Sequence, residues 1–121
     1  MQLRVEYFDQ NESFASYLPR VGKTVRSFTS NDGTTGWVLF RLDKPFEYQF
    51  RVDEAFRFRI VVVTHFLLRS RWAGHEVGGV EATSVFVLLV EEDAVPEQEP
   101  IQIEDYVHAA WGMCTRETGG V

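Results

Sequence analysis

The stretch from Phe56 to Trp72 constrains the fold more than any other part of the chain. Its even positions are almost all apolar, whereas its odd positions are arginines near both ends and apolar in the middle. An alternation with a period of two is typical of a β-strand, because successive side chains point to opposite faces of a sheet. A run of this length is long for one strand, so we expect a bend or bulge near Thr64 and His65. The even positions should face the core. The opposite face should hold four arginines: Arg57, Arg59, Arg69 and Arg71.

Other segments of the chain show the same period or are rich in β-branched and aromatic residues. We predict further strands over residues 2–8, 23–29, 37–42, 46–52 and 84–91. Turn signals such as Asn31-Asp32-Gly33 separate them, and long helical patterns do not, which disfavours a parallel βαβ sheet. We therefore expect one mostly β domain over residues 1–121, at the margin of the α+β class. It should be an antiparallel barrel or a sandwich, with one or two short helices.

Two segments are candidates for those helices. Residues 10–18 begin after Asp9, which forms a capping-box pattern with Glu12, and Pro19 ends the segment. Residues 103–115 fit both a helical stripe and a strand face, and Gly112 weakens the helix. We favour a C-terminal helix that covers the sheet, with a strand as the alternative.

Charge is divided unequally along the chain. Residues 1–71 contain eleven of the twelve basic and eight of the eighteen acidic residues, a net charge of +3. Residues 72–121 contain Arg116 against ten acidic residues, a net charge of −9. Residues 91–100 hold five acidic residues and two prolines, which indicates an exposed loop. Either the acidic end packs against the basic middle, or the two ends serve different partners.

Several chemistries lack their motifs in this sequence. His65, His75 and His108 lie far apart, without HxH, HExxH or CxxC spacing, so we predict no metal site. The glycines of residues 74–79 lack the Lys and Ser/Thr of a phosphate-binding loop, and neither GxGxxG nor GxSxG occurs. Cys114 should be a small core residue. We predict no cofactor and assign no catalytic residue.

Composition also bears on compartment and on nucleic acid. A single cysteine excludes an internal disulfide, and Arg4 and Glu6 interrupt any apolar leader. Because no run of about 18 apolar residues exists, we expect a cytoplasmic protein without a membrane partner. The net charge of −6 argues against nucleic-acid binding, which needs a basic face to release counterions.

The closely spaced arginines Arg69 and Arg71 suggest a binding site. On one strand face they would lie about 7 Å apart, so their guanidinium groups need anions between them. Trp72 and His75 follow directly, where a flat ligand could stack. We interpret Arg69, Arg71, Trp72 and His75 as a site for a carboxylate, a phosphate or an acidic peptide. In the alternative interpretation, the two arginines pair with acidic residues of a neighbouring strand or of the acidic half.

Two functional hypotheses follow. The first is a non-enzymatic binding or accessory module for a protein partner or a small anionic ligand. The alternative is a small hydrolase- or isomerase-like enzyme that uses His75 or His65 with a carboxylate as general base. The lack of a compact catalytic motif favours the first hypothesis.

Three segments are apolar on both faces: residues 37–42, 60–68 and 85–90. A single antiparallel layer needs only one apolar face. The C-terminal helix would cover part of the second face, and we expect a symmetric homodimer to cover the rest. The acidic 91–99 loop should then form a solvated rim.

Overall fold

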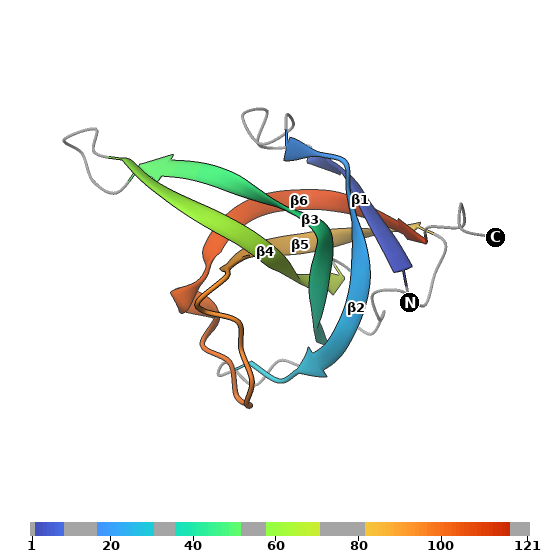
Figure 1. Ribbon diagram of the computed structural model, residues 1–121. Helices are drawn as coiled ribbons and strands as arrows, with labels where there is room; N and C mark the ends of the chain where they lie inside the picture. The colour runs from blue at the N-terminus through green and yellow to red at the C-terminus, as the bar shows by residue number, and fades with distance from the viewer. Residues whose placement is uncertain (1, 9–16, 31–35, 52–57, 71–81, 117–121) are drawn as a thin grey trace.

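The computed structural model of the protein is a closed β-barrel (Figure 1). The residues it describes are 2–8, 17–30, 36–51, 58–70 and 82–116. Six antiparallel strands follow one another around the barrel in chain order, and β6 pairs back with β1. They are β1 (Gln2–Phe8), β2 (Arg20–Phe28), β3 (Trp37–Arg51), β4 (Phe58–Ser70), β5 (Ala82–Glu91) and β6 (Val107–Arg116). The barrel alternative of the predicted fold is therefore confirmed.

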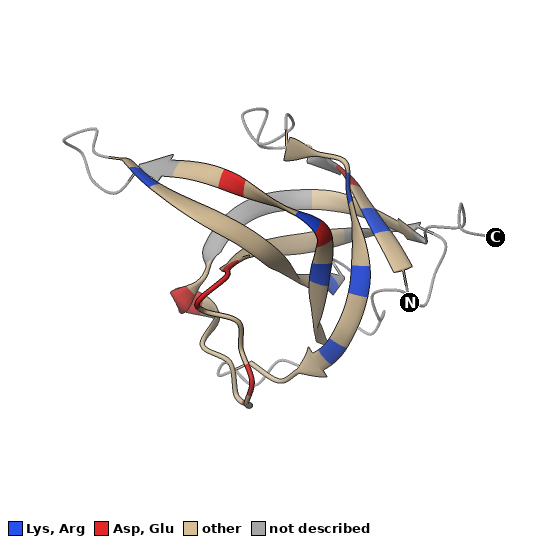
Figure 2. Ribbon diagram, viewed as in Figure 1, with Lys and Arg blue, Asp and Glu red and all other residues tan. Residues whose placement is uncertain are grey.

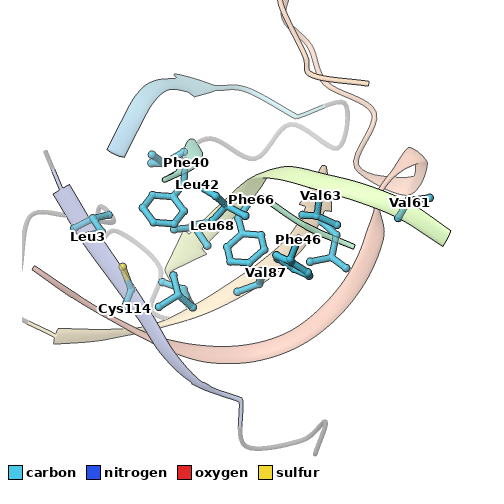
Figure 3. Close-up of a cluster of buried hydrophobic side chains, with 14 residues drawn as sticks. Leu3, Phe40, Leu42, Phe46, Val61, Val63, Phe66, Leu68, Val87 and Cys114 are labelled. Atoms are coloured by element: carbon cyan, nitrogen blue, oxygen red, sulfur yellow. The ribbon is translucent and has the colours of Figure 1, made fainter. Parts of the chain in front are cut away.

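Apolar side chains fill the inside of the barrel (Figure 3). Every strand contributes to this inner cluster except β2, whose Gly22 instead lets β2 and β3 approach closely. Phe66 lies at its centre, with the rings of Phe40 and Phe46 each 6.1 Å from its own. Removing this apolar surface from water is the main term that stabilises the barrel.

The prediction of a C-terminal helix is wrong, because Val107–Arg116 is strand β6. This strand pairs with β5 on one side and with β1 on the other, where Val5 faces Cys114. The pairing satisfies backbone groups of both neighbours, which a covering helix would leave as open edges. The spacing of apolar residues in this segment fits both a helix and a strand, and the closure of the barrel decides for the strand.

Helical structure is scarce in the described part of the chain. A short 3₁₀ helix spans Ile103–Asp105, just before β6. The predicted helix over 10–18 falls mostly on residues 9–16, which lie outside the described residues. None of the described helical segments has the length and apolar character needed to cross a membrane.

Strand β4 contains the irregularity expected near Thr64 and His65. Its register with β5 shifts between Val63 and His65. Val61 and Val63 point into the inner cluster before the shift, and Phe66 and Leu68 after it. The bulge is therefore confirmed.

The predicted core face of β4 is wrong in the part before the bulge. Phe58 and Ile60 are 55% and 63% exposed, although both occupy even positions. One extra residue in a strand changes which parity faces inward, so a single parity cannot hold along the whole segment. Arg59 is exposed as expected. Arg57 and Arg71 lie outside the described residues.

A second apolar cluster lies on the outer surface of β3, β4 and β5. Trp37, Leu39, Leu67, Leu88 and Val90 are all at most 4% exposed there. The connection between β5 and β6, residues 92–106, covers them with four further side chains. These are Val95, Ile101, Ile103 and Tyr106.

The covering connection is anchored to the end of β2. The Ile101 N–H donates to the Thr29 carbonyl at 2.9 Å, and Ser30 forms an isolated bridge with Ile101. The outer faces of residues 37–42 and 85–90, for which the sequence predicts a covering second copy, are thus closed within one chain. The acidic 91–99 segment is more than a solvated rim, because Val95 packs on the cluster.

The close approach of β2 to β3 predicts that Gly22→Ala is strongly destabilising. A Cβ atom at Gly22 would lie 2.8 Å from the Arg41 carbonyl carbon and 3.0 Å from the Phe40 ring. We expect a loss of about 3 kcal/mol in the free energy of unfolding, measured by urea denaturation. Gly36→Ala is the control: nothing lies within 4 Å, and its φ of +87° makes alanine cost only about 1 kcal/mol. Equal stability of the two variants would contradict this packing.

The buried thiol of Cys114 should be inert in the folded protein. Burial raises the pKa of Cys114 to about 12, so almost no thiolate forms near pH 8. We expect the folded protein to react with Ellman's reagent on the order of 1000-fold more slowly than the urea-unfolded chain. Rapid reaction of the folded protein would show that β6 does not bury this side chain.

Candidate anion-binding surface

Of the four predicted site residues, only Arg69 lies within the described part of the chain. It sits near the end of β4, half-buried, with its guanidinium carbon 6.0 Å from the centre of the Trp37 ring. Arg71, Trp72 and His75 lie outside the described residues. The predicted grouping of these four side chains therefore stays a prediction.

Trp37 is an unexpected neighbour for Arg69. Its indole ring is 3% exposed and packs edge-on against Phe86, at 6.3 Å between ring centres. Its buried Nε1–H finds no hydrogen-bond acceptor among the residues that the structure describes. A buried donor without an acceptor costs about 1–3 kcal/mol. An acceptor that reached this N–H would therefore stabilise the protein.

Arg69 likewise has no anionic partner within residues 2–8, 17–30, 36–51, 58–70 and 82–116. Its partner position on β5 is Phe86, and within the described residues no carboxylate forms an ion pair with it. The interpretation that Arg69 pairs with an acidic residue of a neighbouring strand therefore finds no support. The Arg69 guanidinium thus lies near the Trp37 ring, and the described part of the chain provides a matching acceptor to neither Arg69 nor the indole N–H.

A second basic group crosses the outer surface of the barrel. Lys23 on β2 faces Arg41 on β3, and Arg41 in turn faces His65 on β4. Figure 2 shows the basic residues of β2 and β3 side by side. Lys23 and Arg41 carry like charges on directly opposite positions, which repel, so this pair also favours an anion. Sequence reasoning missed it, because its members meet only through strand register.

The acidic segment contacts the basic part of the chain at several points. Arg59 forms an ion pair with Glu91 at 2.9 Å, and the Arg26 guanidinium donates to the Glu97 carbonyl at 3.2 Å. The backbone N–H of Thr29 donates to the Glu99 carboxylate at 3.1 Å. These contacts support the interpretation that the acidic half packs against the basic half.

The side-chain partner that the structure gives His65 is a hydroxyl group. Its Nδ1 lies 2.7 Å from the Thr64 hydroxyl. Partial burial, together with the Arg41 guanidinium, lowers the pKa of His65 below its usual 6.5. Across the described ranges, no three His, Cys, Asp or Glu side chains gather as they would around a metal ion.

The environment of His65 predicts a dependence of stability on pH. Because its pKa is lower in the folded protein, the unfolded chain binds the proton first as pH falls. The contribution of His65 is thus complete above pH 6.5 and is lost as the pH drops below that value. Between pH 7.5 and 5, urea denaturation should show a smaller loss in the free energy of unfolding for His65→Gln than for the wild type. An equal loss in both proteins would contradict this contribution of His65.

Comparison of the chain with protein-family models, with curated proteins and with solved structures finds no match.

Proposed function

We propose that the protein is a non-enzymatic binding module for a carboxylate-bearing ligand, which binds at Arg69. One observation carries the proposal: the Arg69 guanidinium lies 6.0 Å from the centre of the Trp37 ring, and the described residues supply neither a carboxylate to Arg69 nor an acceptor to the buried Trp37 Nε1–H. Arg71, Trp72 and His75 follow Arg69 closely in the sequence and are proposed to complete the site.

Carboxylate chemistry suits this pair of donors. A guanidinium forms short charge-assisted hydrogen bonds with a carboxylate, often two in parallel. The indole N–H can donate only, so it needs an oxygen acceptor. Because the Trp37 nitrogen is shielded from solvent, a ligand oxygen reaches it only by displacing part of what covers the ring. The ligand is proposed to contact Arg69 first.

The carboxylate can belong to a small molecule or to an acidic peptide of a protein partner. The enzyme alternative, which uses His75 or His65, receives less support at His65, because the described partner of its ring is a hydroxyl. His75 lies outside the described residues. A cytoplasmic location remains part of the proposal, supported by the single buried cysteine.

The test is an isothermal calorimetric titration of the full chain with succinate and, in a separate experiment, with a glutamate-rich peptide. We expect Arg69→Gln to weaken binding of the effective probe by about tenfold or more, as the loss of one charge-assisted hydrogen bond implies. Lys44→Gln is the control, since it removes the same charge from an exposed position on β3. Circular dichroism of each variant checks the fold.

Each outcome decides a different point. Preference for succinate or for the peptide identifies the source of the carboxylate. Equal weakening by Arg69→Gln and Lys44→Gln would indicate general charge attraction and contradict the site. Absence of binding by either probe at millimolar concentration would contradict the proposed function.

A further inference from the structure

Three side chains form one row across the outer face of the barrel, and we call Lys23, Arg41 and His65 the basic row. Lys23 on β2 pairs with Arg41 on β3, which pairs in turn with His65 on β4. Their neighbours Phe40 and Phe66 belong to the inner cluster, so alternation along the strands turns the basic row outward. Because neighbouring strands lie about 4.8 Å apart, side chains from these three positions can reach one small ligand.

The basic row is open to solvent and is not closed by an acidic residue at either end. Lys23 and Arg41 are exposed, and His65 is half-buried. The paired positions that continue the row are Gln2 on β1 and Val90 on β5, and both are uncharged. Along the row, strand pairing therefore leaves the two cations without an opposing carboxylate.

The two cations also form no ion pair within the described ranges of the chain. Asp43 is exposed two positions from Arg41 on β3, yet it forms no such pair with either cation. The other cations of β2, Arg20 and Arg26, donate to backbone carbonyls, and each lies over a phenylalanine ring. Lys23 and Arg41 thus repel each other across the strand pair, and an anion bound between them would offset this repulsion.

His65 adds a neutral hydrogen-bond donor to the two cations. Partial burial and the Arg41 guanidinium lower the pKa of His65, so its ring is neutral at pH 8. Its Nδ1 lies 2.7 Å from the Thr64 hydroxyl. With this hydroxyl donating to Nδ1, the neutral ring carries its proton on Nε2, which can donate to a ligand.

We propose that the basic row binds a phosphate dianion, either free phosphate or the phosphate group of a small phosphomonoester. The two positive charges match its two negative charges, and its tetrahedral oxygens can accept from an ammonium, a guanidinium and an imidazole together. A carboxylate has one charge and two oxygens in a plane, which a single guanidinium already matches.

This site is separate from the proposed carboxylate site at Arg69. Arg69 lies four positions from His65 on β4, about 13 Å away at the usual rise of a strand. The phosphate proposal therefore does not depend on the proposed function.

The test is calorimetric titration of the full chain with inorganic phosphate and, separately, with glycerol phosphate, at pH 8 and constant ionic strength. We expect Lys23→Gln and Arg41→Gln each to weaken binding by about tenfold or more, as the loss of a charge-assisted hydrogen bond implies. Lys44→Gln is the matched control, because it removes an exposed cation from β3 outside the basic row. This variant and Arg69→Gln should bind phosphate as the wild type does. Tighter binding of one probe identifies the source of the phosphate group.

Urea denaturation separates loss of the ligand from damage to the fold. In phosphate-free buffer, Lys23→Gln removes the repulsion with Arg41, so its midpoint should lie above that of the wild type. Added phosphate should raise the midpoint of the wild type and of Lys44→Gln, because it binds only the folded state. It should raise the midpoint of Lys23→Gln much less. A damaged fold would instead lower the midpoint in both buffers.

Failure of both probes to bind at millimolar concentration overturns the proposal. Equal weakening by Lys44→Gln overturns it too, because it would indicate general charge attraction. Binding that leaves the NMR resonances of the His65 ring unmoved contradicts the location. Dimethyl phosphate, a diester with one charge, should bind more weakly than phosphate, and equal binding would contradict a dianion site. None of these results bears on carboxylate binding at Arg69.

Discussion

The structure depends on one constraint: the central strands β3, β4 and β5 are apolar on both faces, so both faces need cover. The inner faces are covered by closing the sheet on itself, which makes β6 a strand. The outer faces are covered by the connection between β5 and β6, which crosses them and is held at the end of β2 by Ile101. Barrel closure and the path of this connection each remove one apolar face of these strands from water.

The sequence predicts the strands well, because a period of two reports directly on backbone geometry. It also predicts the bulge near His65, since a strand longer than usual must bend. It does not predict β6, because residues 103–115 fit the period of a helix as well as that of a strand. What decides is that the edges of β1 and β5, distant in the sequence, need a strand between them. It does not predict the covering connection either. Its apolar residues, such as Val95 and Ile101, are scattered among acidic residues and prolines, which suggests an exposed loop.

The candidate site, too, is predicted only in part from the sequence. Arg69 is recognisable from sequence, because closely spaced arginines in an apolar strand are unusual. Trp37 is not recognisable as its neighbour, and Arg41 is not recognisable as the neighbour of Lys23 and His65. These contacts depend on strand register, which a single sequence does not specify.

The central claim is that one chain closes both faces of its central strands. Hydrogen exchange of individual amides, followed by NMR, tests it most directly at Ile101, whose N–H donates to Thr29 at 2.9 Å. The account predicts that this amide is protected to a degree similar to the interior amides of β5, although it lies in an acidic connecting segment. Exchange at the rate of an unstructured loop would show that the connection does not cover the outer cluster, and would contradict the account.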